Sequence, residues 1–154
     1  EWLYVDRNAP GTSFISDAKT VVAQVEDDFG VPIDAVFVGD TAPTPRLESL
    51  LAATREALVN AVRHGRPPVS LYIEVGEKTV DVYVRDQGDG FDLAAIPTDR
   101  FGVRESIIGR TQRRGGTATV DVRPGRGTEI RLSLPLADPD GATTTYGRAG
   151  KEKR

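Results

Sequence analysis

Apolar residues recur every three to four positions in two segments of the chain, and this period predicts two amphipathic helices. The first helix covers residues 16–29, with Ser16 or Asp17 as its N-cap and Gly30 as the residue that ends it. The second helix covers residues 47–64. Its apolar stripe consists of Leu47, Leu50, Leu51, Thr54, Leu58, Ala61 and Val62.

Other segments alternate strictly between apolar and polar residues, which is the period of a strand. Two segments do not alternate in this way: residues 35–38 are expected to form a short strand, and residues 101–114 are weakly helical. The remaining strands form two hairpins, made of residues 69–75 with 79–86 and residues 117–123 with 128–134. Because each hairpin strand is apolar on one side only, we expect a sheet with one face under helices and the other in water. The predicted fold class is a two-layer α/β sandwich.

Composition excludes several classes of function. With 154 residues, 38% hydrophobic and 28% charged, the chain has the composition of one soluble globular domain. The net charge of −3 argues against a nucleic-acid-binding surface. No cysteine is present, so disulfides, thiol nucleophiles and cysteine-ligated metals are excluded, and the single histidine, His64, excludes a histidine-rich metal site. No apolar run has the roughly 20 residues of a membrane span.

The ends of the chain suggest its organisation. Residues 1–136 are expected to form the ordered domain, and residues 137–154, which contain almost no large apolar side chain, a disordered tail. The chain begins at Glu1 and contains no methionine, so we expect it to be a fragment of a longer protein.

The second helix carries polar residues opposite its leucine stripe. Glu56, Asn60 and His64 step by four positions on that side, and Ala53 and Ala57 among them are expected to leave room for a ligand. The alternative is an ordinary solvated helix face. An asparagine in the middle of a helix is a mildly poor helix former and therefore needs a reason.

Two strand residues should also point toward the covered face of the sheet. Asp86 continues the inward parity of 80, 82 and 84, and a buried carboxylate without a partner is costly. Gly88 and Gly90 follow it and let the backbone approach a ligand closely. Thr128 has the inward parity of the second hairpin. Judged alone, Asp86 could be a turn residue and Thr128 a strand cap.

Generic nucleotide and metal motifs are absent. The chain contains no G-x-x-x-x-G-K-[ST] loop and no G-x-S-x-G elbow. Leu93 replaces the third glycine of a dinucleotide fingerprint, and Pro97 replaces the last glutamate of a calcium loop. Gly102, between Arg100 and Arg104 before a helical stretch, suits a phosphate, although a surface arginine pair is the simpler interpretation.

Taken together and in order, four segments resemble the boxes of the GHKL ATPase superfamily. These are ExxxNAxRH (56–64) as the N box, DQGDGF (86–91) as the G1 box, FGVRESIIGRTQRRGG (101–116) as the G2 box and PGRGTEIRLSLP (124–135) as the closing hairpin. The resemblance covers roughly residues 1–136 and is strongest to NarL/DesK-type sensor histidine kinases. The sequence GVRESIIGR further resembles that of an actinobacterial subgroup of these kinases.

The resemblance implies a Bergerat fold, with a mixed, mostly antiparallel sheet, helices on one face and ATP under a lid. Asn60 would hold Mg²⁺, Asp86 would accept a hydrogen bond from the adenine amino group, and Glu56 would be a general base or contact a metal-bound water. Glu105 stands where the family often has a second glycine, which weakens the lid-side phosphate contacts. The implied ATP-binding residues are Asn60, Arg63, His64, Asp86, Gly88, Gly90, Gly102, Val103, Arg104 and Thr128.

The implied activity is that of a protein-histidine kinase in a two-component system. The ATP γ-phosphoryl group would pass to a histidine on an upstream dimerisation domain that this chain lacks. A NarL/LuxR-type response regulator would be the partner, and the parent protein would be a homodimer. We expect a cytoplasmic domain and leave open whether its parent is anchored in the membrane. An anti-sigma-factor-type serine kinase, or a nucleotide-binding module that transfers no phosphate, are the alternatives.

One geometric expectation underlies the interpretation. The Asn60 side chain on the second helix and the Asp86 side chain at the end of a strand should face the same hollow, with the nucleotide between them.

Overall fold

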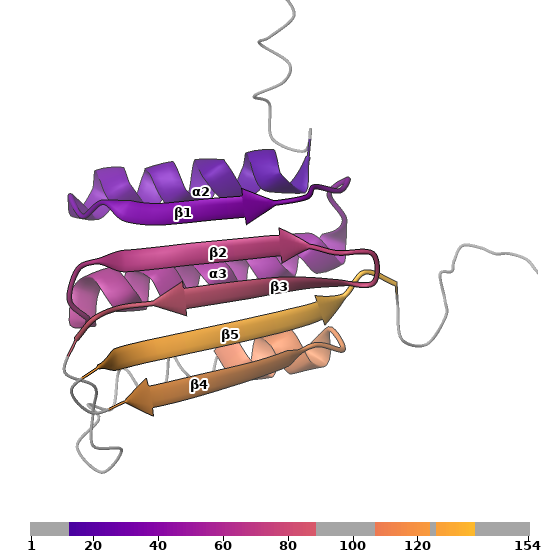
Figure 1. The fold of residues 1–154 in the computed structure, drawn as a ribbon. Coiled ribbons are helices and arrows are strands. Elements are labelled where there is room, and N and C mark those ends of the chain that lie inside the picture. Colours follow the sequence, from indigo (N-terminus) through magenta and orange to yellow (C-terminus); the bar gives the residue numbers. More distant parts are fainter. Residues whose placement is uncertain (1–12, 89–106, 124–125, 138–154) are drawn as a thin grey trace, which may run out of the picture.

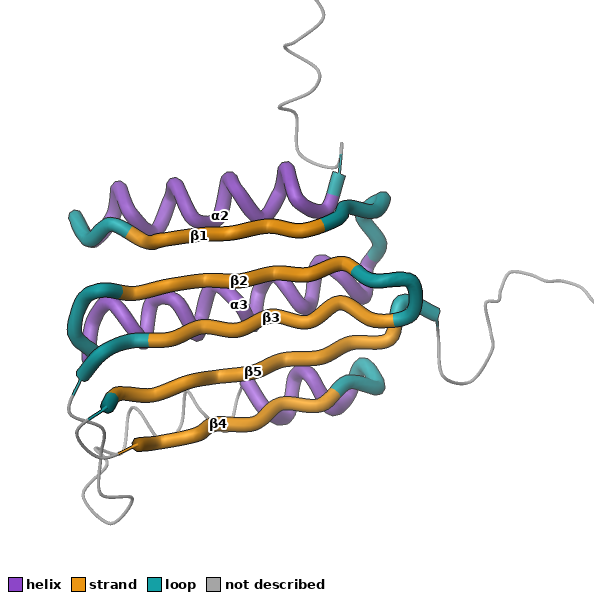
Figure 2. The backbone as a smooth tube through the Cα atoms, in the orientation of Figure 1, coloured by secondary structure: helices purple, strands orange, loops and turns teal. Residues whose placement is uncertain are grey.

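The computed structural model describes residues 13–88, 107–123 and 126–137, which form one sheet with helices on a single face (Figure 1). Its helices are α2 (Phe14–Phe29), α3 (Pro45–His64) and a short helix at 107–113. Its strands are β1 (Ile33–Val38), β2 (Val69–Val75), β3 (Thr79–Arg85), β4 (Thr117–Arg123) and β5 (Gly127–Pro135). Figure 2 shows the same arrangement by type of element, with the helices behind the strands.

The sheet has five strands in the order β1-β2-β3-β5-β4. β1 is parallel to β2, whereas the β2–β3, β3–β5 and β4–β5 pairs are antiparallel. Both predicted hairpins form, and they join through β3 and β5 at the centre of the sheet. The expected two-layer α/β sandwich, with a mixed and mostly antiparallel sheet, is confirmed.

The core lies between the sheet and the helices, as strand alternation requires. In β3 the inward side chains Val80, Val82 and Val84 are at most 2% exposed. On α3 the predicted stripe is buried, with Leu58 fully covered and the Thr54 hydroxyl donating to the Leu50 carbonyl oxygen at 2.8 Å. Val62 is only partly buried.

Four elements begin earlier than predicted: β5 by one residue, at Gly127, and the other three by two residues each. The N-cap of α2 is Ser13, whose side chain accepts from the Ser16 amide, rather than Ser16 or Asp17. The added turn is held because Phe14 is fully buried and its amide donates to the Thr41 carbonyl oxygen at 2.9 Å. Helix α3 begins at Pro45 with Thr44 as its cap. Strand β1 begins at Ile33, which pairs with Val69 and is buried.

The expectation that Ala53 and Ala57 leave room for a ligand is wrong. Both side chains are fully buried and belong to the core. Ala53 and Ala57 lie on the side of α3 that carries Ser49 and Glu56, which contact the segment 107–114, and away from Arg55, which pairs with Asp28 of α2. The polar positions of α3 that remain for a functional site include Glu56 and Asn60, opposite the leucine stripe.

Some expectations fall outside the residues described. They concern the N-terminal segment 1–12, the tail beyond 137, and the predicted site residues Gly90, Gly102, Val103 and Arg104. Within the parts of the chain that are described, no helix has the length and hydropathy needed to cross a bilayer.

The packing of α3 on the sheet predicts the stability of the domain. Leu58→Ala removes a fully buried side chain and should lower the free energy of unfolding by about 2–5 kcal/mol. Val36→Ala, at a side chain that is 55% exposed on β1, is the control and should cost less than about 1 kcal/mol. Urea denaturation followed by circular dichroism measures both. Equal losses for the two variants would contradict this description of the core.

Candidate functional site

Asp86 lies immediately after β3 and is buried, with 6% of its surface exposed. Its amide donates to the Thr128 carbonyl oxygen at 3.1 Å, and the next amide, of Gln87, donates to the Arg66 carbonyl oxygen at 2.9 Å. The backbone is thus held by the start of β5 on one side and by the α3–β2 connection on the other. The inward direction predicted from the parity of β3 is confirmed.

Three glycines enclose Asp86. The Gly88 amide donates to Asp86 Oδ1 at 2.8 Å. A Cβ at Gly65 would overlap the Asp86 side chain, and a Cβ at Gly127 would overlap the Asp86 carbonyl oxygen. Gly127 also has a φ of 99°, a left-handed conformation that favours glycine. Gly65 instead has an extended backbone, so its requirement for glycine comes from the close approach of Asp86.

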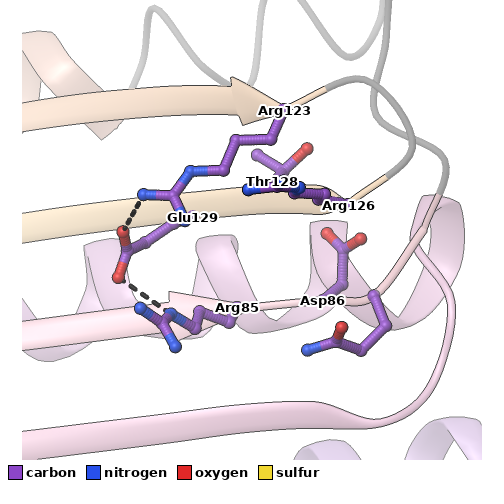
Figure 3. Close-up of a pocket in the computed structure, with 8 residues that line it drawn as sticks. Arg85, Asp86, Arg123, Arg126, Thr128 and Glu129 are labelled. Carbon is purple, nitrogen blue, oxygen red and sulfur yellow. Dashed lines mark hydrogen bonds and ion pairs between the residues drawn. The ribbon is translucent and has the colours of Figure 1, made fainter.

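A hollow of about 320 Å³ opens beside Asp86 (Figure 3). The Asp86 carboxylate extends from the end of β3 toward the start of β5, where Thr128 lies. The hollow is lined by Arg85, Asp86, Gln87, Arg123, Arg126, Gly127, Thr128 and Glu129. It therefore combines a buried carboxylate and a hydroxyl with a rim of charged side chains of both signs.

The rim is organised by Glu129. Its carboxylate accepts from Arg85 Nε at 2.9 Å and pairs with Arg123 Nη2 at 3.5 Å (Figure 3). Arg126 has no side-chain partner among the residues described. Arg123 also pairs with Asp121 Oδ2 at 2.8 Å, so carboxylates balance most of the positive charge of the rim.

The other predicted residues lie on α3. Asn60 Oδ1 is buried and has no hydrogen-bond partner in the described structure. Glu56, one turn earlier, forms an ion pair with Arg110 of the helix 107–113. Arg63 and His64 are exposed in the last turn of α3, where positive charge is favourable.

Asn60 and Asp86 both lie near the C-terminal end of α3. Gly65, which contacts Asp86, follows Asn60 by five residues, or about 7.5 Å along the helix axis. Asn60 is nevertheless not among the residues that line the hollow beside Asp86. The residues described thus hold two adjacent polar features, one at the C-terminal half of α3 and one at the β3–β5 end.

Unsatisfied polar atoms mark both features. In the described residues, the buried side-chain atoms without a hydrogen-bond partner are Arg46 Nε, Asn60 Oδ1 and Thr128 Oγ1. Leaving such an atom unpaired costs about 1–3 kcal/mol. Two of the three belong to residues that the sequence had singled out, and both are suited to bind a ligand.

The donor set fits the expected magnesium ion. Mg²⁺ prefers oxygen ligands, keeps several waters and needs few protein ligands, and the orphaned Asn60 Oδ1 is one such oxygen. Among the residues described, no group of three or more histidine, cysteine, aspartate or glutamate side chains gathers into a metal site. A metal held mainly by substrate and water is the arrangement that these residues allow.

Sequence reasoning missed three contributors to the site. Gly65 contacts Asp86, and its place directly after the N-box segment was a signal of a role in the site. Arg110 pairs with a residue 54 positions away, and no local pattern predicts such a contact. Arg126 lies between two glycines of the closing hairpin, and nothing in the local sequence indicates that it lines the hollow.

Comparisons with known proteins show the family and the fold of this chain. The family model described as "Histidine kinase-like ATPase domain" matches residues 15–133. The Mycobacterium tuberculosis "Sensor histidine kinase component HK1" is 29% identical over 141 residues, covering 82% of this chain and 77% of the relative. The Bacillus subtilis "Signal transduction histidine-protein kinase/phosphatase DegS" is 29% identical over 118 residues, covering 70% of this chain and 30% of the relative.

A further relative, an "Uncharacterized sensor-like histidine kinase" of Chloroflexus aurantiacus, is 28% identical over 115 residues; the match covers 70% of this chain but only 18% of the relative's length. Among solved structures, the histidine kinase domain of the Erythrobacter litoralis EL346 blue-light activated histidine kinase superposes with a TM-score of 0.62 at 20% identity, over 80% of this chain and 61% of that one. The mycobacterial sensor histidine kinase MprB superposes with a TM-score of 0.61 at 15% identity, over 80% of this chain and 94% of that one.

The family match spans most of the chain, and the solved kinase domains share its fold. The chain belongs to the family of histidine kinase-like ATPase domains.

Proposed function

We propose that this chain is the ATP-binding catalytic domain of a two-component sensor histidine kinase. In this proposal the γ-phosphoryl group of ATP passes to a histidine on a dimerisation domain of a longer, homodimeric protein. The phosphoryl group then passes to a NarL/LuxR-type response regulator. The family membership and the names of the relatives support the proposal. The single structural observation behind it is that the buried side-chain oxygens of Asn60 and Thr128 have no hydrogen-bond partner among the residues described.

The hollow beside Asp86 suits the adenine base. A carboxylate oxygen accepts hydrogen bonds only, so Asp86 selects a ring edge that presents an amino donor. Gly88 supports this role because its amide already binds Asp86 Oδ1 and holds the carboxylate in one orientation. The Thr128 hydroxyl, which can donate or accept, supplies a second polar contact at the same end.

The C-terminal half of α3 suits the phosphates. Asn60 would hold Mg²⁺, which when bound neutralises phosphate charge and draws the phosphate oxygens together. Arg63 and His64, at the end of the same helix, add positive charge or hydrogen-bond donors. In phosphoryl transfer most of the protein's contribution is positioning and electrostatic stabilisation, and these residues supply both.

Phosphorylation chemistry tests the proposed function. A longer protein that includes the segment upstream of this chain should form an acid-labile phosphohistidine from γ-labelled ATP. Adding a receiver domain should then remove the label. A stable phosphoserine on an added protein would favour the serine-kinase alternative, and bound nucleotide without any transfer would favour a regulatory module.

Asn60→Ala should abolish magnesium-dependent ATP binding while the fold persists, because it deletes the only protein oxygen proposed for the metal. Titration calorimetry with ATP in Mg²⁺ and in EDTA measures the effect, and circular dichroism checks the fold. Gln24→Ala removes an exposed amide from α2 and is the matched control. Unchanged affinity in Asn60→Ala would refute the assignment.

Asp86→Asn keeps the size of the side chain but turns one acceptor into a donor. We expect ATP affinity to fall about 10-fold or more, the cost of a lost hydrogen bond to a charged group. Selectivity for ATP over GTP should weaken in the same titrations. Equal binding of ATP and GTP by the unmodified chain would count against the role of Asp86.

Gly65→Ala should mimic the loss of Asp86, because its Cβ would overlap the Asp86 side chain. ATP affinity should fall about 10-fold or more, as in Asp86→Asn. Gly30→Ala is the control, since Gly30 has a φ of 67° but a Cβ added there would meet nothing within 4 Å. That control should lower stability without changing ATP affinity, and a Gly65→Ala domain that binds ATP normally would contradict the packing argument.

A further inference from the structure

Glu56 is not a free carboxylate. Its Oε1 is bound by Nη1 of Arg110, which comes from the helix 107–113, 54 positions later in the chain. Each of the two side chains is about one-third exposed, at 34% for Arg110 and 32% for Glu56. A general base must offer an oxygen within hydrogen-bond reach of the proton that it removes. Here the carboxylate is instead engaged with the neighbouring helix.

A second contact joins the same two elements. Arg114, just after the helix 107–113, donates from Nε to Ser49 Oγ at 3.1 Å. Arg110 meets α3 at Glu56 and Arg114 meets it seven positions earlier, so the two segments run in opposite directions. The side of this helix that faces the core is secured separately: Ile107 is fully buried, and the buried Thr111 hydroxyl donates to the Ile107 carbonyl oxygen at 2.9 Å.

The ion pair acts close to the proposed magnesium ligand. Glu56 precedes Asn60 by four residues, so the two side chains are neighbours on one helix face, with Cβ atoms about 5–6 Å apart. The Arg110 guanidinium is therefore held about one helical turn from the orphaned Asn60 oxygen. A pair this exposed adds little to global stability, so its effect should be local and positional.

We propose that Glu56 is a positioning residue that acts through Arg110. It fixes the helix 107–113, and with it a guanidinium group, beside the magnesium–phosphate side of the site. This inference rests on the proposed function, because it concerns the same nucleotide site. It differs from a general-base role in a measurable way: a base is needed only for transfer, whereas a positioning pair already affects the binding of Mg²⁺–ATP.

A double-mutant cycle on this chain tests the proposal. Glu56→Gln, Arg110→Gln and the double variant are titrated with Mg²⁺–ATP by calorimetry. Each single change should weaken binding by about the same factor, of roughly 10-fold, and the double variant should be no weaker than either one, because the two residues act as one unit. Arg113→Gln is the matched control, since Arg113 is exposed on the same helix and has no side-chain partner in the described residues.

Hydrogen exchange without nucleotide supplies the second readout. Both single variants should speed amide exchange in the helix 107–113 equally, and the control should not. Normal ATP binding by Glu56→Gln, independent losses that multiply in the double variant, or weakened binding without faster exchange would each overturn the proposal. If the unmodified chain binds no Mg²⁺–ATP, the proposed function itself fails, a result distinct from these.

Discussion

The site depends on one close-packed contact, the burial of Asp86 where the end of β3 meets the end of α3. A buried carboxylate is costly unless its oxygens are satisfied, and here one oxygen accepts the Gly88 amide while the backbone is held on both sides. The absence of a Cβ at Gly65 and Gly127 lets two other chain segments approach to this distance. The sheet, the helix end and the hairpin turn therefore meet at a single side chain whose remaining acceptor capacity is available to a ligand.

Unsatisfied groups elsewhere follow the same logic. A buried polar group in the core is normally hydrogen-bonded, as the Thr54 hydroxyl is to the Leu50 carbonyl oxygen. In the described residues the exceptions are Asn60 Oδ1 on α3, Thr128 Oγ1 near the start of β5, and Arg46 Nε. Unpaired buried polar atoms persist in native proteins where a ligand or a functional constraint compensates for them. The placement of Asn60 and Thr128 agrees with a nucleotide whose base and metal-bound phosphates occupy opposite ends of the site.

The sequence predicted those features that depend on local period. The inward directions of Asp86 and Thr128 follow from strand alternation, and the pairing of strands in hairpins follows from short turns. Features that depend on packing between distant segments were not predicted from the sequence. Ala53 and Ala57, which proved to be core, and the Glu56–Arg110 pair both lie on the side of α3 that meets the segment 107–114, and no spacing in the sequence predicts this contact. The N-cap of α2 was missed because burial of Phe14 extends the helix by a partial turn.

The central claim is that the base binds beside Asp86 and Thr128 while the metal-bound phosphates bind beside Asn60. The most direct measurement is an NMR titration of the ¹⁵N-labelled chain with Mg²⁺ and a non-hydrolysable ATP analogue. The account predicts saturable shifts of the Gly88 and Thr128 amides and of the Asn60 side-chain amide, with the Asn60 signal responding only when Mg²⁺ is present. Shifts confined to another surface, or Asn60 and Gly88 signals that ignore the nucleotide, would contradict it.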